Sequence, residues 1–357
     1  MSAGDAAGAR ADAPGPSVSW PDITDRLLHG TDLSTADAEA AMTAIMDGST
    51  SAVQIAGFLV ALRAKGETAA EIAGLVRTMR RFAIAVPVDG PTVDTCGTGG
   101  DRSGTFNIST VAAVVAAAAG ARVAKHGNRA ASGRCGSADL LEAWGVAISL
   151  PPAAVARCIE DVGIGFCFAQ AYHPAMRHVM PARRELGVRT VFNFMGPLSN
   201  PAGAAHQTIG VSDPLMAERM AQVLAELDAA HALVFHGHDG LDELTTTAPS
   251  RIWEVREGAV EAYDLDPADL GIPHADAADL VGGDVGTNRA MADAVIDGKP
   301  GPTRDVVVLA AAAALYAANV VDGLGAGIPA ATTAIDTGAA RGVLDRWVAL
   351  SQELSPA

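Results

Sequence analysis

Aromatic residues and positive charge are both scarce in this sequence of 357 residues. Phe, Trp and Tyr make up 4 % of the chain, and 25 Lys and Arg stand against 41 Asp and Glu, giving a formal net charge of −16. Non-specific binding to nucleic acid depends on clustered Lys and Arg that neutralise phosphates. The charge balance therefore argues against a nucleic-acid partner, and an anionic ligand would need a locally basic pocket.

Cysteine is also rare, and the cysteines present lack the spacing of a metal site. Cys96, Cys135, Cys158 and Cys167 form no CxxC pair and have no histidine at zinc-ligand spacing. Neither a zinc site nor a disulfide framework is predicted. A reducing cytoplasm is the expected location.

Long apolar runs are missing as well. The longest, Val306 to Val320, has about 15 residues, whereas roughly 20 are needed to span a bilayer. The first 15 residues mix Asp and Arg with Ala and Gly and lack the apolar stretch of a signal peptide. We therefore expect no membrane partner, a buried helix over the apolar run, and a disordered leader over residues 1–18.

Small and aliphatic residues are abundant, and 49 % of the chain is apolar, enough for one large or two moderate cores. Four helical segments between Asp22 and Phe82 begin at Ser or Thr caps and are separated by Gly, which predicts a small all-helical domain over residues 19–86. After Pro87 to Pro91, short apolar strands alternate with Ala-rich helices. This predicts a large α/β domain over residues 87–357, with a largely parallel central sheet flanked by helices. The predicted strands cover 91–95, 121–126, 190–193, 206–211 and 232–237.

The first candidate site motif is DTCGTGGDRSGTFNIST, at residues 94–110. It places a Gly-rich loop between a strand and a helix, where backbone N–H groups and the helix N-terminus can bind a phosphate or pyrophosphate. The alternative is a plain turn with an N-cap at Ser109 or Thr110. The loop is neither a Walker A motif, because no Gly-Lys-Ser/Thr follows, nor GxGxxG, because Arg102 stands at the last glycine position.

The second motif is KHGNRAASGRCGSADLLEAWGV, at residues 125–146. Lys125, Arg129 and Arg134 put three cations within ten positions, next to the hydroxyl of Ser132, and could form the basic pocket that an acidic protein needs for an anion. A solvated surface turn is the alternative. Ser137 is expected to be the N-cap of a helix over residues 138–144.

Two further motifs supply acids and arginines. Asp242 and Glu243 follow a strand that should end near Gly237, and adjacent carboxylates can share a hard cation such as Mg²⁺. His236 and His238 lie nearby, but no further zinc ligands have suitable spacing. Arg183 and Arg184 lie on a helix predicted to end at Gly187, and one of them could pair with a substrate carboxylate. Solvated acids and an exposed helix face are the alternatives.

Taken together, these motifs resemble those of the anthranilate phosphoribosyltransferases. The similarity runs from about Trp20 to Leu350 through GTGGD, NIST, KHGNRAAS, FNFMGPLSNP, DELTTT and GGDVGTNRAMADAVIDG, in that order. It implies a small helical domain joined to the α/β domain by hinge and helical segments at about 169–192, and a cytoplasmic homodimer paired through the helical domains. It also implies transfer of the phosphoribosyl group from phosphoribosyl pyrophosphate to anthranilate in tryptophan biosynthesis, with two Mg²⁺ ions per monomer.

The same resemblance assigns the site residues. It implies that Ser109 reaches one magnesium, that Asp242 and Glu243 bind the second, and that Gly97, Asn128 and Arg183 contact anthranilate. The implied donor-binding residues are Gly97, Thr98, Gly99, Gly100, Asp101, Thr105, Asn107, Ile108, Ser109, Thr110, Lys125, His126, Gly127, Asn128, Arg129, Ala130, Ala131, Ser132, Gly133 and Ser137.

Three positions depart from the family's pattern: Gln170 and Gly133 stand where Pro and Ser are common, and Ala310 replaces a frequent Asn. Gln170 precedes the His173–Pro174 step near the acceptor tunnel, so it leaves a different aromatic amine acid open as acceptor. A pyrimidine nucleoside phosphorylase of the same fold is the other enzymatic alternative, using inorganic phosphate without the acid pair. A nucleic-acid-binding relative would require a basic groove. No residue is assigned as a general base.

Overall fold

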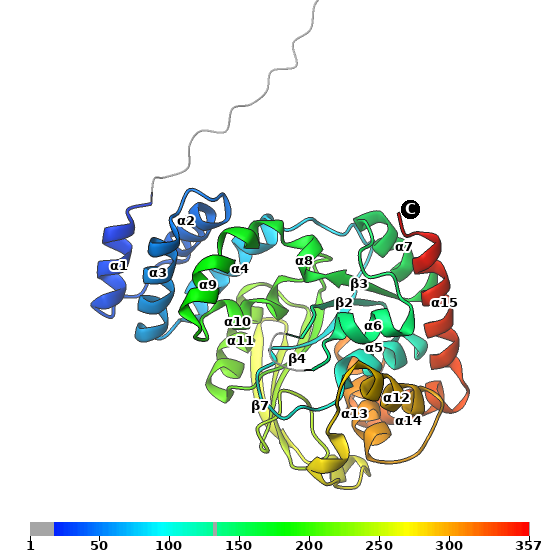
Figure 1. Ribbon diagram of the computed structural model, residues 1–357. Helices are drawn as coiled ribbons and strands as arrows, with labels where there is room; N and C mark the ends of the chain where they lie inside the picture. The colour runs from blue at the N-terminus through cyan, green and yellow to red at the C-terminus, as the bar shows by residue number, and fades with distance from the viewer. Residues whose placement is uncertain (1–17, 131–133, 357) are drawn as a thin grey trace, which may run out of the picture.

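The computed structural model describes residues 18–130 and 134–356. Of the predicted leader only Val18 is described, and Ala131, Ser132 and Gly133 of the predicted donor site also lie outside these ranges. Figure 1 shows a bundle of helices at one end of the molecule and a sheet covered by helices at the other.

The helical bundle is formed by α1 Trp20–Leu28, α2 Thr35–Met46, α3 Ala52–Lys65 and α4 Ala69–Arg81. Ser34, Ser51 and Thr68 are the N-caps of α2, α3 and α4, and each forms a reciprocal capping box with the third residue of its helix. The predicted caps are confirmed. These local hydrogen bonds explain why the helices begin where the sequence pattern placed them.

The sheet has seven strands in the order β3-β2-β1-β4-β5-β6-β7. The pairs from β3 through β5 are parallel, whereas β5–β6 and β6–β7 are antiparallel. The predicted largely parallel sheet is therefore confirmed. The strands are β1 Val93–Gly97, β2 Val123–Gly127, β3 Ile164–Phe168, β4 His206–Gly210, β5 His231–Gly237, β6 Ser250–Arg256 and β7 Ala259–Leu265.

Helices cover both faces of the sheet, and they divide the apolar core. Leu233 and Phe235 of β5 belong to one buried cluster, whereas Ala232 and Val234 belong to a second cluster that continues into the helical bundle. This alternation follows from the two-residue period of a strand. One face thus shares its core with the small domain.

The other helices are α5 Ile108–Ala118, α6 Ser137–Trp144, α7 Pro152–Val162, α8 Ala169–Tyr172, α9 Met180–Leu186, α10 Phe192–Met195, α11 Pro214–Glu226, α12 Val285–Ile296, α13 Pro302–Ala317, α14 Leu324–Asp336 and α15 Ala339–Glu353.

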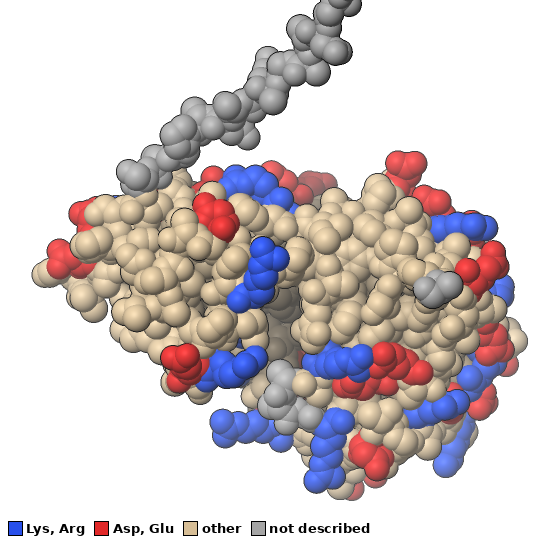
Figure 2. Space-filling view, turned by 45° about the horizontal axis from the view of Figure 1, so that its top comes forward, with Lys and Arg blue, Asp and Glu red and all other residues tan. Residues whose placement is uncertain are grey.

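The predicted buried helix over the longest apolar run is confirmed, because α13 spans Pro302–Ala317 and is enclosed along most of its length. Within residues 18–130 and 134–356, no helix is long and apolar enough to cross a membrane. Figure 2 shows a hollow between the helical bundle and the α/β part, with Lys or Arg side chains along its margins.

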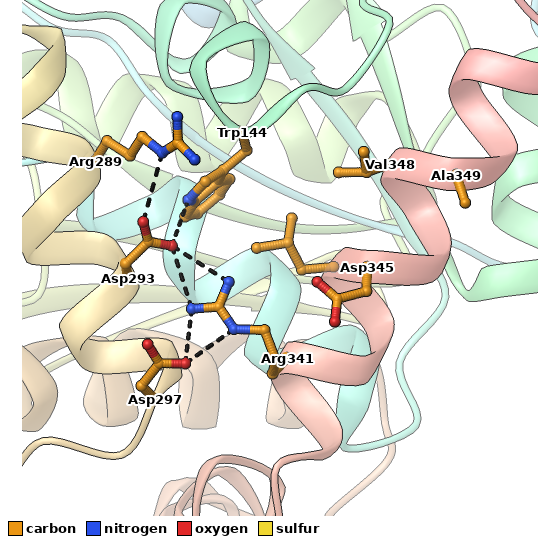
Figure 3. Close-up of a pocket in the computed structure, with 9 residues that line it drawn as sticks. Trp144, Arg289, Asp293, Asp297, Arg341, Asp345, Val348 and Ala349 are labelled. Carbon is orange, nitrogen blue, oxygen red and sulfur yellow. Dashed lines mark hydrogen bonds and ion pairs between the residues drawn. The ribbon is translucent and has the colours of Figure 1, made fainter.

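A recess of about 410 Å³ lies between α6, α12 and α15, and Trp144 at the end of the second motif lines it (Figure 3). Arg341 of α15 donates to Asp293 and Asp297 of α12 at 3.2 and 2.7 Å, and Trp144 Nε1 of α6 donates to Asp293 Oδ1 at 3.1 Å. Because these charges pair with one another, the cluster connects three helices.

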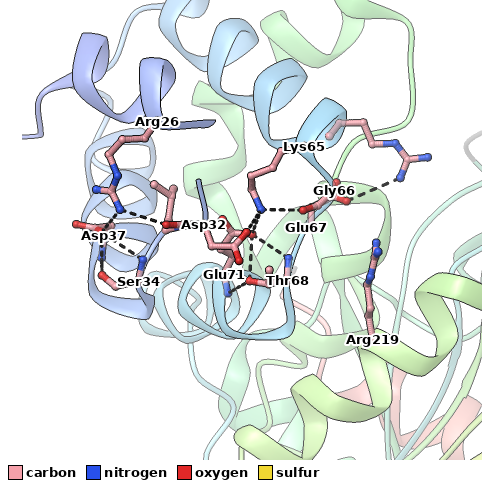
Figure 4. A network of polar contacts seen from close by, with 12 residues as sticks. Arg26, Asp32, Ser34, Asp37, Lys65, Gly66, Glu67, Thr68, Glu71 and Arg219 are labelled. Carbon is pink, nitrogen blue, oxygen red and sulfur yellow. Dashed lines mark hydrogen bonds and ion pairs between the residues drawn. The ribbon is translucent and has the colours of Figure 1, made fainter. Parts of the chain in front are cut away.

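A second polar network connects the helices of the bundle (Figure 4). Lys65 Nζ donates to Asp32 Oδ1 at 2.6 Å and to Glu71 Oε2 at 3.0 Å, while the backbone N–H of Leu33 donates to Glu71 Oε1 at 2.9 Å. Glu71 is fully enclosed, so it needs these partners to remain charged. The network fixes the segment before α2 against the start of α4.

Three details of the predicted secondary structure are wrong. Residues 190–193, predicted as a strand, overlap α10, because a short apolar run does not distinguish a buried strand from a buried helical turn. Strands β3, β6 and β7 were missed. The N-cap of α6 is Gly136 and not Ser137, and Asp139 accepts the backbone N–H of Gly136 at 2.8 Å.

Candidate active site

The predicted site motifs meet at one edge of the sheet. Strands β1, β2, β4 and β5 are parallel and end at Gly97, Gly127, Gly210 and Gly237. Because parallel strands end at the same edge, the loops after them converge. The Gly-rich loop, the Lys125 segment and the Asp242–Glu243 pair are brought together in this way.

The Gly-rich loop has the backbone conformation of an anion-binding site. Gly99, Gly100 and Arg102 have φ of +66°, +84° and +64°. The N–H of Gly99 donates to Asp242 Oδ2 at 2.5 Å, whereas those of Gly100, Asp101 and Arg102 have no partner within the described chain. Successive unpaired N–H groups with left-handed residues among them form a concave nest that favours an anion.

Close approach of the acid pair explains two glycines at the strand ends. A Cβ at Gly97 would lie 2.7 Å from Asp242 Oδ2, and one at Gly210 would overlap the backbone carbonyl of Asp242. The acid loop therefore lies directly over the ends of β1 and β4. Any side chain at either position would displace Asp242.

The two carboxylates are held where ionisation is unfavourable. Burial and the neighbouring charges of Glu243 and Asp101 raise the pKa of Asp242 well above its usual range. Burial raises the pKa of Glu243 to about 7, while Lys125 opposes that shift. Two acids that resist joint ionisation fit a divalent cation, which would stabilise both charged forms.

The other potential metal ligands near this edge do not add to the pair. Among residues 18–130 and 134–356, no group of three or more His, Cys, Asp or Glu side chains is arranged to hold a metal ion. His236 Nδ1 bonds to the carbonyl of Val211 at 2.7 Å, and His238 pairs with Asp264 at 3.2 Å. The arrangement suits Mg²⁺, which keeps several waters and takes few protein ligands, and it does not suit zinc.

Lys125 lies beneath the site and not on its surface. Its side chain is 1 % exposed, and Nζ donates to the carbonyl of Thr95 on β1. Burial lowers its pKa, although Asp94 and Glu243 favour its charged form. The lysine therefore supplies positive charge next to Glu243 from within the sheet.

The other two cations of the predicted basic pocket lie differently. Arg129 pairs with Asp139 at 2.9 Å and with Glu142 at 2.5 Å, and its guanidinium lies 5.7 Å from the ring centre of Phe168. Arg134 is exposed. In this structure Arg129 is thus already neutralised by α6, so the three cations do not act as one free basic cluster.

The N-terminus of α5 is fixed by two side chains. Asn107, its N-cap, donates through Nδ2 to the carbonyl of Cys135 at 3.0 Å and accepts from Asn288 Nδ2 at 2.9 Å. Thr110 donates to the Ser137 hydroxyl at 3.0 Å. Ser109 lies in the first turn and not at the cap. These bonds aim the helix N-terminus, with its favourable dipole, at the same edge of the sheet.

On the acceptor side, Asn128 Oδ1 accepts a hydrogen bond from Gln170 Nε2 at 3.2 Å. Arg183 lies on α9 with its guanidinium 5.5 Å from the ring centre of Phe192, and this guanidinium makes no hydrogen bond or ion pair with the described residues. Burial lowers its pKa. A half-enclosed, unpaired guanidinium is suited to bind a carboxylate.

Sequence reasoning missed Arg189, Ser212 and Asn288. Ser212 directly follows β4, so the rule that ligands gather at strand ends could have indicated it. Arg189 and Asn288 act through contacts with residues about 90 and 181 positions away, and no local pattern marks them. His126 and His173 form a buried pair with ring centres 5.2 Å apart, and burial lowers their pKa to about 3 and about 4.

The fold and this edge of the sheet are those of a glycosyl transferase. The α/β-domain model of the glycosyl transferase family matches residues 89–341, and the family's helical-bundle model matches residues 21–83. The chain is 54 % identical to the anthranilate phosphoribosyltransferase of Roseiflexus castenholzii, covering 91 % of this chain and 96 % of that protein. It is 53 % identical to that of Thermobifida fusca, covering 93 % and 97 %. The chain belongs to the anthranilate phosphoribosyltransferase family.

Solved structures agree with this assignment. The crystal structure of the Thermus thermophilus anthranilate phosphoribosyltransferase superposes with a TM-score of 0.88 at 46 % identity, covering 93 % of this chain and 99 % of that one. The Saccharomyces cerevisiae enzyme in complex with PRPP (phosphoribosyl pyrophosphate) and Mg superposes with a TM-score of 0.86 at 25 % identity, covering 94 % and 98 %.

Proposed function

We propose that this chain transfers the 5-phosphoribosyl group from phosphoribosyl pyrophosphate to anthranilate. The products are N-(5-phosphoribosyl)anthranilate and pyrophosphate, in the second step of tryptophan biosynthesis from chorismate. The single observation that carries the proposal is the unpaired N–H nest at Gly100–Arg102, held by Gly99 against the Asp242 carboxylate. The pyrophosphate of the donor suits the unpaired N–H groups, and a divalent cation suits the carboxylate.

The donor is assigned to the Gly-rich loop, the N-terminus of α5 and the Lys125 segment. Two magnesium ions per monomer are part of the proposal, one near Ser109 and the other at Asp242 and Glu243. The yeast relative's complex with PRPP and Mg supports the use of this donor and of this metal by the shared fold. The raised pKa values of Asp242 and Glu243 support it from this chain's own residues.

Anthranilate is assigned to Gly97, Asn128 and Arg183, with its carboxylate on Arg183. A yeast relative has been solved with 4-fluoroanthranilate, which supports an acceptor of this chemistry. Within the described chain no contact joins Asn128 to Arg183. An acceptor lying between the two would be held at its amine end by Asn128 and at its carboxylate by Arg183.

The mechanism follows from charge and position. Pyrophosphate is a good leaving group, so the site needs neither a protein nucleophile nor a strong acid, and holding the amine in line with the anomeric carbon lowers the barrier. Asp242, Glu243 and Ser109 would hold the Mg²⁺ ions, which would supply positive charge to the departing pyrophosphate. The Gly100–Arg102 N–H groups and the buried Lys125 add fixed positive potential at the same place. The proton of the attacking amine passes to anthranilate's own carboxylate or to water.

The chain is further proposed to act as a cytoplasmic homodimer that pairs through its helical domain. Leu28 of α1 and Val53 and Val60 of α3 are 68 %, 82 % and 46 % exposed. Val53 and Val60 are seven positions apart and lie on one face of α3, which is unusual for large apolar side chains on a solvated helix. The free thiols of all four cysteines fit a reducing compartment.

The test is a fluorescence assay of the purified protein. Anthranilate fluorescence should fall when phosphoribosyl pyrophosphate and Mg²⁺ are both present, and it should hold steady with EDTA. Pyrophosphate release is measured in parallel, and 4-aminobenzoate replaces anthranilate in a matched run. Release with 4-aminobenzoate but not with anthranilate would mean a different acceptor. Activity with inorganic phosphate and a nucleoside, without metal, would instead favour a nucleoside phosphorylase.

A further inference from the structure

Arg189 connects the segment between α9 and α10 to the Gly-rich loop. Its Nη2 donates to the carbonyl of Gly99 at 3.3 Å and to the hydroxyl of Ser212 at 3.1 Å. The Ser212 hydroxyl donates to the same Gly99 carbonyl at 3.1 Å. The Thr98 hydroxyl next to it in the chain also donates to this carbonyl, at 3.3 Å. One carbonyl of the loop thus accepts hydrogen bonds from its neighbour and from two side chains that come from other parts of the fold.

The guanidinium is fixed from behind. It lies 5.2 Å from the ring centre of Phe194, which is 1 % exposed and belongs to the core cluster shared by the sheet and the helical bundle. Its Nη1 lies close enough that a Cβ at Gly100 would be 3.0 Å away. The arginine is therefore packed between the core and the loop, with little freedom to move.

Fixing the Gly99 carbonyl also fixes the next N–H. The described peptide bonds are all trans, and in a trans peptide the C=O and the following N–H point in opposite directions. The N–H of Gly99 donates to Asp242 on one side, and its carbonyl accepts from Arg189 and Ser212 on the other. The N–H of Gly100 must then point away from Arg189, and it has no partner within residues 18–130 and 134–356.

We propose that Arg189 is a positioning residue for the donor: it holds the Gly99–Gly100 peptide so that the Gly100 N–H faces the bound pyrophosphate. Arg189 does not itself touch the donor in this arrangement. The inference rests on the proposed donor-binding role of the Gly-rich loop. It also couples that loop to the α9–α10 segment, so a shift of this segment changes donor affinity.

A contribution to folding stability does not explain why an arginine stands at position 189. The Nε of Arg189 is buried without a hydrogen-bond partner, which costs free energy in the folded state. Replacement by Met keeps the stacking on Phe194 and removes that unpaired donor. Arg189→Met should therefore unfold at nearly the same temperature as the unchanged protein, and any loss of activity would not come from unfolding.

The first test compares Arg189→Met with the charge-matched control Arg157→Met, whose arginine forms an exposed pair with Asp161 on α7. Loss of the charged hydrogen bonds predicts a rise of about tenfold in the KM for phosphoribosyl pyrophosphate, with the KM for anthranilate changed less than about twofold. The control should change neither. Equal changes in both KM values, or a change in kcat alone, would overturn the inference.

Two further variants separate position from charge. Arg189→Lys keeps the charge but cannot donate to both oxygens from the plane above Phe194, so it should restore little of the lost affinity. Ser212→Ala removes the second donor to the same carbonyl without changing charge. Its effect and that of Arg189→Met should be less than additive, because they act on one peptide. Full recovery with Lys would assign the effect to charge and overturn the positioning role.

Titration calorimetry with phosphoribosyl pyrophosphate and Mg²⁺ alone keeps this inference distinct from the proposed function. If the unchanged protein binds the donor but does not consume anthranilate, the proposed acceptor fails while the Arg189 comparison still holds. If Arg189→Met binds the donor as tightly as the unchanged protein, the inference fails whatever the acceptor is.

Discussion

The backbone N–H of Gly99 donates to Asp242 Oδ2 at 2.5 Å, which joins the Gly-rich loop to the acid pair across 143 positions of sequence. One Asp242 oxygen therefore orients the loop, and Glu243 follows directly in the chain. The proposed anion site and the proposed cation site are thus connected by one hydrogen bond. A substitution at Asp242 should therefore affect both the Gly-rich loop and the acid pair.

Asp242→Asn tests the acid pair. The amide can no longer share a cation, so we expect the Mg²⁺ concentration for half-maximal activity to rise by about tenfold or more. Without metal the variant should be as stable as the unchanged protein or more so, because the repulsion from Glu243 and Asp101 is removed. Rates against free Mg²⁺ and melting curves in EDTA measure the two effects.

Asp228→Asn is the control for this substitution: Asp228 is exposed, and Asn tolerates its positive φ of 57°. An unchanged metal requirement would remove Asp242 from the metal site.

Two substitutions should distinguish the binding of anthranilate from the binding of the donor. Arg183→Ala removes the unpaired guanidinium and should chiefly raise the KM for anthranilate, by about tenfold or more for a charged hydrogen bond. Lys125→Ala should chiefly weaken use of the donor, because the buried charge next to Glu243 is lost. Steady-state kinetics with each substrate varied in turn provides the measurement. The reverse pattern would exchange the two assignments.

Local chemistry made part of this architecture predictable, and long-range contacts made the rest unpredictable. Ser34, Ser51 and Thr68 could be assigned as caps because each bonds within its own first turn. The Gly-rich loop could likewise be predicted, because glycines between a strand and a helix are typical of a loop that binds a phosphate. The segment at 190–193 could not be assigned correctly, since a run of three buried residues shows neither the period of a strand nor that of a helix.

The charged residues of the site also show that contacts between distant parts of the chain limit prediction from the sequence. Arg129 was predicted to face a phosphate, but it pairs with Asp139 and Glu142, which stand in the same motif and could have been weighed against it. Lys125 was predicted to be one of three cations in a basic pocket, but it lies in the middle of a largely buried strand and its charge acts from below. Arg189 could not be found at all, because its role depends on how the α9–α10 segment packs against β1 and β4.

The helical surface at α1 and α3 predicts a concentration-dependent dimer. Val53→Glu places a charge on the most exposed of these apolar side chains, so we expect a shift toward monomer with the helical content unchanged. Light scattering after size exclusion, together with circular dichroism, measures both. Val260→Glu, at a 38 % exposed valine on β7, is the matched control. If Val53→Glu leaves the mass unchanged, the dimer does not form through this surface.

Glu254 predicts a pH dependence of stability that is independent of the active site. Hydrogen bonds from His231, Tyr316 and Tyr263 at 3.1, 2.7 and 2.9 Å lower its pKa to about 2. Because the folded pKa lies below the unfolded value of about 4.3, this stabilisation is full above pH ~4.3 and is lost as the pH falls toward 2. Glu254→Gln should lower the free energy of unfolding by on the order of 2 kcal/mol at pH 7.

Urea unfolding of Glu254→Gln at several pH values between 7 and 3 gives the measurement. The difference from the unchanged protein should stay constant down to about pH 4.3 and shrink as the pH falls further toward 3. Glu226→Gln, an exposed change at the end of α11, should show no such trend. A constant difference across this pH range would mean that the lost hydrogen bonds do not depend on the charge of Glu254.

Gln170 decides how Asn128 is presented to the acceptor. Its Nε2 donates to Asn128 Oδ1, which leaves the Asn128 amide nitrogen to face other groups. Gln170→Leu keeps the size and removes this donor, so the Asn128 amide oxygen keeps only the hydrogen bond from the Arg129 backbone N–H, at 2.8 Å, and is held less firmly. We expect the KM for anthranilate to rise by about three- to tenfold, as for one neutral hydrogen bond, with the KM for phosphoribosyl pyrophosphate unchanged. The preference for anthranilate over 4-aminobenzoate should fall in the same assay, whereas Gln222→Leu, at an exposed position on α11, should leave both unchanged. If Gln170→Leu instead alters only the donor's KM, then Asn128 serves the donor loop, and acceptor choice must come from Arg183 and the residues around it.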